Sequence, residues 1–198
     1  MVTKRMNLEE LEKIDSKKMY QTYDKWPEIA KDGFENDFEK FDAKGIDHIV
    51  FSGMGGSGSI GDVISAILSK EDIHVSNVKG YHLPKTVDSN TLVISTSVSG
   101  NTKETLTVLE KAQKTDAKIA IFSSGGMIQK FSKTNNLFFQ EISMIHSPRA
   151  SFPKFLFSIL NILREIIPIK KTDVEEAISS LEITRNTIFS NNLTEDNI

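Results

Sequence analysis

The chain has 198 residues, of which 38% are hydrophobic and 26% charged, and its formal net charge is −3. This composition is ordinary for one folded domain with a buried core, and so small a net charge provides no basic field for nucleic acid or a membrane surface. Because the sequence has no cysteine, it excludes disulfides, thiolate chemistry and thiolate metal sites, and with no apolar leader or membrane-length apolar run we expect a cytoplasmic protein.

Residues 1–45 are predicted to form a helical arm, because apolar residues recur there at helical spacing. We expect Pro27 to end the second helix and the third segment to end near Gly45. These stripes are interpreted as a packing surface, either onto the rest of the chain or onto a partner chain. The apolar positions of the three segments are Leu8, Leu11 and Ile14, then Met19, Tyr20, Tyr23 and Trp26, and then Phe34, Phe38 and Phe41.

From residue 46 onward, strand-like and helix-like segments alternate along the chain. Such alternation requires a mostly parallel sheet covered by helices, with right-handed crossovers, so the predicted fold class is α/β. Ligands bind such sheets at the carboxyl ends of the strands. Strands are predicted at 47–52, 73–78, 91–96, 117–123 and 137–142, and helices at 58–69, 101–114 and 126–133.

A glycine-rich turn at 53–59 follows the first predicted strand and precedes a predicted helix. Glycine allows positive φ and a close approach of ligand to backbone, while the helix directs its N–H groups at a bound anion. Gly53, Gly55 and Gly58 also satisfy the dinucleotide pattern G-x-G-x-x-G, but the acidic residue that a nicotinamide site needs about 20 residues later is missing. Lys79, at the end of the second strand, leaves an NADP site as an alternative.

The loop after the third predicted strand contains three hydroxyl residues, Ser97, Ser99 and Thr102. Three hydroxyls beside a helix N-terminus, where backbone N–H groups lack partners and the macrodipole is positive, predict a phosphate-binding pocket. The alternative is an ordinary N-cap, which needs only one hydroxyl. Glu104, in the first turn of that helix, is expected to complement the dipole and is not assigned as a catalytic base.

After the last predicted strand the sequence leads into a strongly apolar segment, 155–167, predicted to be a buried helix that Pro168 closes. Arg149 lies at the entrance of this helix, where its guanidinium would hold a carboxylate or a developing oxyanion. A surface ion pair is the alternative role for Arg149. A further helix is predicted from about Asp173 to Phe189, followed by a polar tail at 191–198.

Four short motifs, in their order and spacing, resemble the sugar isomerase (SIS) domain family, and within it the N-terminal domain of the archaeal-type bifunctional phosphoglucose/phosphomannose isomerases. The motifs are residues 53–58, 97–105, 123–126 and 148–150. The resemblance implies an αβα sandwich with a five-stranded parallel sheet that binds a hexose 6-phosphate without a cofactor. The implied site residues are Ser97, Ser99 and Thr102 around the phosphate, Gly55, Gly56 and Ser57 against the sugar, and Arg149 beside the reacting carbons, where it would stabilise an enediolate.

This sequence departs from the family in one respect. Family members carry two such domains in tandem, and the general-base glutamate, the ring-opening histidine and a further lysine come from the second domain, which this sequence lacks. We therefore divide the chain into a helical arm at 1–45, a SIS domain at 46–168, and a C-terminal helix and linker at 169–198 that leads toward the absent domain. The expected function is sugar-phosphate binding within an aldose–ketose isomerase. Such an enzyme interconverts glucose 6-phosphate or mannose 6-phosphate with fructose 6-phosphate, a step of glycolysis and gluconeogenesis. This chain alone is expected to be inactive or weakly active.

Two further functions remain open alternatives: a noncatalytic SIS protein that senses a sugar phosphate, and a single-domain phosphosugar isomerase that acts as an oligomer with shared sites. A homodimer is expected from the resemblance and from the apolar stripes, whereas nucleic acid and membrane are not expected as partners. No acidic or histidine residues show the spacing of metal ligands. The four histidines, His48, His74, His82 and His146, are assigned to strand edges or the surface, with His82 and His146 nearest the expected strand ends.

Overall fold

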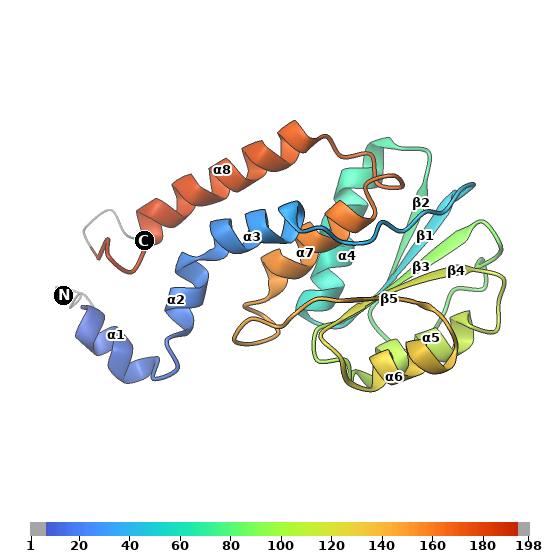
Figure 1. The fold of residues 1–198 in the computed structure, drawn as a ribbon, viewed down its shortest axis with the longest axis horizontal. Helices are drawn as coiled ribbons and strands as arrows, with labels where there is room; N and C mark the ends of the chain where they lie inside the picture. Colours follow the sequence, from blue (N-terminus) through green and yellow to red (C-terminus); the bar gives the residue numbers. More distant parts are fainter. Residues whose placement is uncertain (1–6, 194–198) are drawn as a thin grey trace, which may run out of the picture.

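A five-stranded sheet forms the centre of the molecule in a computed structural model that describes residues 7–193. The strand order is β2-β1-β3-β4-β5, and every neighbouring pair runs parallel (Figure 1). The predicted α/β fold with a five-stranded parallel sheet is therefore confirmed. The strands are β1 His48–Ser52, β2 His74–Val78, β3 Thr91–Ser97, β4 Lys118–Ser123 and β5 Phe138–Glu141.

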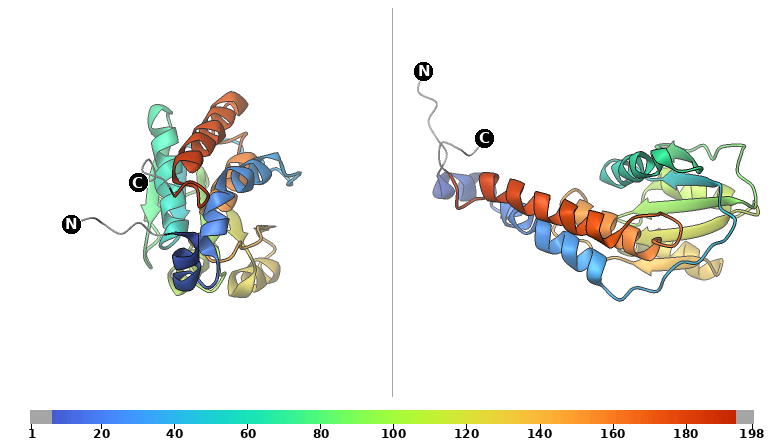
Figure 2. Two further views of the ribbon diagram at one scale, coloured as in Figure 1. Left: turned by 90° about the vertical axis from the view of Figure 1, so that its left-hand side faces the viewer. Right: turned by 90° about the horizontal axis from the view of Figure 1, so that it is seen from above.

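Helices cover both faces of this sheet. On one face lie α5 and α6, and on the other lie α4 and α7, with α3 packed against α7 and α8 beside α3 (Figures 1 and 2). Figure 2 also shows that α1, α2 and the end of α8 project beyond the sheet. The helices are α1 Leu8–Ile14, α2 Met19–Asp24, α3 Trp26–Glu35, α4 Gly56–Ile67 with the 3₁₀ turn Leu68–Lys70, α5 Lys103–Ala112, α6 Gly126–Thr134, α7 Phe152–Ile162 and α8 Lys171–Ile188.

Side chains that alternate along the central strands divide the core into two clusters. Ile49 and Phe51 pack in the larger cluster, with α4 and α7, whereas Val50 between them packs in the cluster under α5 and α6. Both β1 and β3 are buried at every position. Burial on both faces explains why these strands are recognisable as continuous apolar runs, as expected for the centre of a parallel sheet.

The N-terminal arm differs from its prediction at two points. Pro27 does not end a helix but lies in the first turn of α3, where a proline is tolerated because those N–H groups have no partner within the helix. The third predicted helix is also wrong, since only Phe34 is helical and residues 36–47 form an extended strap. Phe38 and Phe41 still pack on the core, and the Phe41 N–H donates to the Ile162 carbonyl at 3.2 Å, so the apolar spacing reflects contacts of a non-helical segment.

The C-terminal part also contains an early helix end. Helix α7 stops at Ile162 although the apolar run continues, and Leu163 and Ile167 stay fully buried in turns. Because these residues are buried but not helical, the apolar run 155–167 predicted a helix that extends too far toward the C-terminus. Helix α8 matches its prediction within two residues at each end, and the last part of the predicted polar tail, 194–198, lies outside the described residues. Among residues 7–193, no helix combines the length and apolar character needed to cross a membrane.

Candidate functional site

The sheet reverses its direction of growth between β1 and β3. From β1 the chain passes to β2 on one side, whereas from β3 it passes to β4 and β5 on the other. The two central strands pair directly, with Ser52 opposite Ser95, so the loops that follow them begin side by side at the carboxyl edge. In open α/β sheets ligands bind at such a reversal. The topology thus brings the two sequence-predicted loops, 53–57 and 97–102, to one place.

The loop after β3 is organised around one buried hydroxyl. Ser97 Oγ lies 2.9 Å from Thr102 Oγ1 and accepts a hydrogen bond from the Gly100 N–H at 3.1 Å. Thr102 is the N-cap residue of α5, yet its side chain makes no capping hydrogen bond. Ser99 is exposed, and its hydroxyl accepts the Asn101 N–H at 3.4 Å. The ordinary N-cap is therefore not what the structure shows, and the start of α5 keeps its backbone donors for another acceptor.

The loop after β4 interlocks with the loop after β3. Asn101 Oδ1 accepts the Met127 N–H at 3.1 Å, and the Gly100 carbonyl accepts the Ile128 N–H at 2.9 Å, so the start of α6 is bonded within the chain. Gly100 has φ +69, and a Cβ there would lie 1.8 Å from the carbonyl oxygen of Gly125. Sequence reasoning gave Asn101 no role of its own. Its position between a serine-rich loop and a following strand–glycine–helix motif is the only available signal.

The glycines of the turn after β1 have two different roles. A Cβ on Gly53 or Gly58 would meet backbone atoms of this turn at 2.9 or 2.7 Å, so both are explained by close packing. Gly55 has φ +54, and neither Gly55 nor Gly56 would place a Cβ within 4 Å of another atom. Ser57, in the first turn of α4, is half-buried. Open space beside Gly55 and Gly56 is what a ligand that approaches the backbone needs.

Lys79 is paired within the chain. Its Nζ lies 2.5 Å from Asp62 Oδ2, and Asp62 also accepts from the Asn77 amide at 3.1 Å. An arrangement that neutralises Lys79 provides no free charge for the 2′-phosphate of NADP. The geometry does not favour the dinucleotide alternative.

Arg149 lies on the loop 142–151, which joins β5 to α7 and extends beyond the sheet on the side of the N-terminal helices (Figure 1). Its side chain is exposed and makes no ion pair with any of residues 7–193. The loop is held by Ser151, whose hydroxyl accepts the Ile145 N–H at 2.8 Å and lies 2.8 Å from the Ser147 carbonyl and 3.1 Å from the Ile145 carbonyl, to either of which it can donate its one proton. The alternative of a surface ion pair is therefore not seen, and a free guanidinium is carried by a well-fixed loop.

Known proteins resemble this chain over most of its length. Residues 44–140 match the SIS domain. The bifunctional phosphoglucose/phosphomannose isomerases of Thermoplasma acidophilum and Aquifex aeolicus are 34% and 36% identical over 153 and 157 residues. The chain belongs to the SIS domain family. Its aligned part is 76% of this chain in both cases but 44% and 48% of those relatives, so the chain spans less than half the length of these curated relatives.

A solved structure has a fold similar to that of this chain. A candidate phosphosugar isomerase from Clostridium difficile 630 superposes with a TM-score of 0.60, at 20% sequence identity, over 92% of this chain and 53% of that protein. At this identity the likeness concerns the fold alone.

The histidines differ in their surroundings. His48 is buried in β1, where its ring nitrogens lie 3.1 Å from Ser76 Oγ and 3.3 Å from Thr91 Oγ1. Burial lowers the pKa of His48 below its usual range. His146 Nε2 lies 3.1 Å from the Lys17 carbonyl, and His82 is exposed in the loop after β2. Within the described part of the chain, no group of histidine and acidic residues could hold a metal ion.

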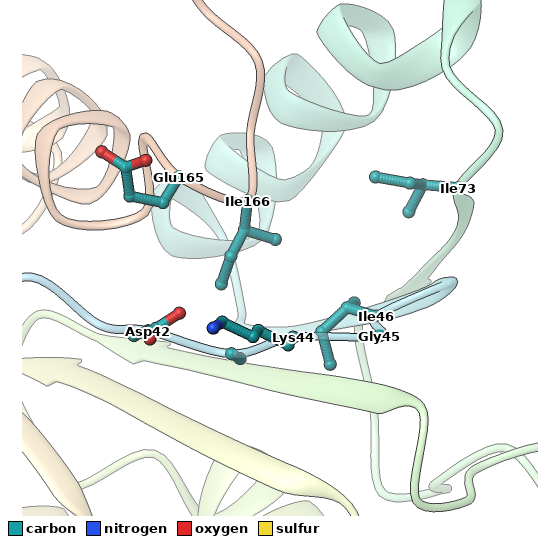
Figure 3. A pocket seen from close by; sticks show the side chains of 8 residues that line it. Asp42, Lys44, Gly45, Ile46, Ile73, Glu165 and Ile166 are labelled. Carbon is teal, nitrogen blue, oxygen red and sulfur yellow. The ribbon is translucent and has the colours of Figure 1, made fainter.

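A shallow surface hollow of about 530 Å³ lies at the opposite end of the sheet. Figure 3 shows its lining, which includes Ile46 just before β1, Ile73 just before β2, and the charged residues Lys44 and Glu165. Because these residues precede the strands, the hollow is at the amino edge. None of the predicted site residues lines it, and ligands of parallel sheets bind at the carboxyl edge.

Proposed function

We propose that this chain is the sugar-phosphate-binding half of an aldose–ketose isomerase that interconverts glucose 6-phosphate or mannose 6-phosphate with fructose 6-phosphate. The observation that carries the proposal is the start of α5. It lies at the reversal of the sheet, its N-cap side chain does not cap it, and three hydroxyl residues surround it. A helix N-terminus with open N–H groups and neutral hydroxyl donors binds a phosphate dianion.

Glu104 is the acidic residue in the first turn of α5, where its charge complements the helix dipole. Its carboxylate accepts a hydrogen bond from the Tyr81 hydroxyl, and this bond raises the pKa of Tyr81. The carboxylate is thus engaged by the loop after β2. We infer that Ser99 and Thr102 bind the phosphate and that Ser97 holds Thr102 in position.

The remaining predicted residues fit the rest of a hexose. Gly55, Gly56 and Ser57 lie at the start of α4, at the same carboxyl edge of the sheet, and the open space at the two glycines admits the sugar chain close to the backbone. Isomerisation moves a proton between adjacent carbons through an enediolate, whose negative oxygens need a fixed positive partner. In this proposal the unpaired guanidinium of Arg149 supplies that charge.

Two carboxylates at this edge of the sheet are engaged by side chains of this chain. Glu104 accepts from Tyr81, and Glu141 accepts from the Gln129 amide at 3.1 Å. Proton transfer in such a reaction needs a positioned base, worth about 10²–10⁴ in rate. We propose that the base comes from outside this chain, either from a second domain or from another subunit of a homodimer. This same feature favours the second candidate, a noncatalytic SIS protein that senses a sugar phosphate.

A thermal-shift titration with fructose 6-phosphate, run beside inorganic phosphate and NADPH, tests the proposal. A ligand at 100 times its dissociation constant adds about 2.7 kcal/mol of stability. We expect a shift with fructose 6-phosphate that exceeds the shift with phosphate, and none with NADPH. A shift with NADPH alone would reject the proposal. An assay of fructose 6-phosphate turnover separates the two candidates. The second domain of a related isomerase is added to this chain; an isomerase half should then gain activity, whereas a noncatalytic sensor should not.

A further inference from the structure

The indole of Trp26 bonds the loop that carries Arg149. Trp26 Nε1 donates to the Ala150 carbonyl at 3.0 Å, although the two residues are 124 positions apart in the sequence. The Tyr23 ring packs edge-on against the indole, with the ring centroids 4.8 Å apart. Trp26 is the single tryptophan of the chain and begins α3. A side chain from the N-terminal arm therefore reaches the carbonyl of the residue that follows Arg149.

Two more contacts join the arm to the same loop. His146 Nε2 lies 3.1 Å from the Lys17 carbonyl, and the Ser147 hydroxyl donates to Met19 Sδ at 3.8 Å. The loop has no helix or strand between residues 142 and 151, and its internal bonds centre on the Ser147 and Ser151 hydroxyls. The arm thus fixes the outer side of a loop that Ser151 fixes from within.

We propose that Trp26 is a positioning residue for Arg149. The inference rests on the proposed function, in which Arg149 stabilises an enediolate. Arg149 is exposed and has no ion pair with the described residues, so the loop backbone alone fixes the point from which its side chain extends. The indole bond holds the carbonyl of Ala150, which immediately follows Arg149. A loop that is fixed in advance loses less freedom when its arginine meets an oxyanion, and such preorganisation depends on neighbours that lock the backbone.

This role gives the N-terminal arm a function that its apolar stripe does not explain. Packing alone accounts for the apolar stripe, and a phenylalanine in place of Trp26 would keep most of that packing. The indole N–H is the part that phenylalanine lacks. The proposal therefore predicts a specific defect at the Arg149 side of the site, without a defect at the phosphate side near α5.

The test compares Trp26→Phe with the parent chain, using two anionic ligands and hydrogen exchange. Arabinonate 5-phosphate carries a carboxylate that imitates the enediolate oxygens, whereas inorganic phosphate engages only the phosphate pocket. In calorimetric titrations we expect Trp26→Phe to weaken the binding of arabinonate 5-phosphate about three- to tenfold, the range for loss of one neutral hydrogen bond. Phosphate affinity should stay within about twofold, and amides of 142–151 should exchange faster.

Tyr20→Phe is the matched control, because it removes a hydrogen bond of 3.0 Å to Glu12 within the same arm but away from the loop. It should change neither ligand affinity nor exchange in 142–151. His146→Asn provides a second loop variant, since asparagine tolerates the positive φ of 56 at this position and removes the ring contact with Lys17. It should repeat the defect of Trp26→Phe.

The outcomes separate the inference from the proposed function. Equal weakening of both ligands in Trp26→Phe, or no change in either, would overturn the positioning role. If the parent chain binds neither ligand, the proposed function fails, and exchange alone decides the inference. Faster exchange confined to 142–151 would then support a loop fixed by Trp26, and unchanged exchange would reject it.

Discussion

Helices α5 and α6 begin in similar ways but differ in what their N-termini can bind. Both follow a buried strand and a loop rich in glycine and serine, and neither has a side-chain cap from its N-cap residue. At α6 the first-turn N–H groups are bonded to the Asn101 side chain and the Gly100 carbonyl. At α5 the loop bonds itself, and the helix end stays open. Similar strand–loop–helix sequences therefore produce two different helix ends. The start of α6 forms a structural joint, meaning that it is hydrogen-bonded to the loop after β3, whereas the start of α5 is a candidate anion site.

Replacement of Gly100 should have the largest effect, because this glycine forms the joint. Gly100→Ala would place a Cβ 1.8 Å from the Gly125 carbonyl oxygen at a φ of +69. We expect a loss of more than about 3 kcal/mol in the free energy of unfolding, measured with urea. Gly56→Ala is the matched control, since its Cβ meets nothing within 4 Å. It should keep or slightly raise stability and lower affinity for fructose 6-phosphate, and equal stability of the two variants would contradict the comparison.

Substitution of Thr102 should remove binding energy at the open helix end. Thr102→Val takes away a hydroxyl that lies 2.9 Å from Ser97 Oγ and makes no capping bond. We expect sugar-phosphate binding to weaken by about 1–3 kcal/mol, the range for a hydrogen bond to a charged group, and Ser99→Ala to act likewise. Ser124→Ala is the control at the closed end, where the Ser124 hydroxyl donates to the Val98 carbonyl at 2.5 Å. Calorimetry should show normal affinity for Ser124→Ala, and unchanged affinity in Thr102→Val and Ser99→Ala would remove the phosphate assignment.

Asn101 offers a smaller test of the closed helix end. Its Oδ1 is the acceptor of the Met127 N–H, so Asn101→Ala leaves that donor to water. We expect a loss of about 1 kcal/mol in unfolding free energy, with hydrogen exchange faster at the start of α6 and unchanged at the start of α5. Faster exchange at α5 instead would mean that the two helix ends are not independent.

The sequence predicted the sheet well because its strands are short apolar runs separated by glycine-rich turns. Glycine and hydroxyl clusters after predicted strands located both loops of the candidate site, since such clusters are local signals. It could not show that Gly53 and Gly58 are packing residues while Gly56 faces open space, because this distinction depends on atoms of other segments. It also missed Trp26, whose partner is 124 residues away. In the arm, apolar spacing predicted a helix at Phe38 and Phe41 where an extended strap meets the same core, since burial alone does not specify backbone conformation.

The smallest expected effect concerns pH and tests why the α5 end remains open to an anion. The Glu104 carboxylate accepts the Tyr81 hydroxyl, which raises the pKa of Tyr81 above its usual 10. The neutral phenol is favoured in the folded chain, so the bond adds stability below about pH 10 that is lost as the pH rises through the folded pKa. Glu104→Gln should bring the Tyr81 titration, followed by ultraviolet absorbance and assigned with Tyr81→Phe, back toward its usual range. A Tyr81 pKa that does not move in Glu104→Gln would mean that the carboxylate is not held by Tyr81, and a carboxylate free to face the first turn of α5 would compete with phosphate there.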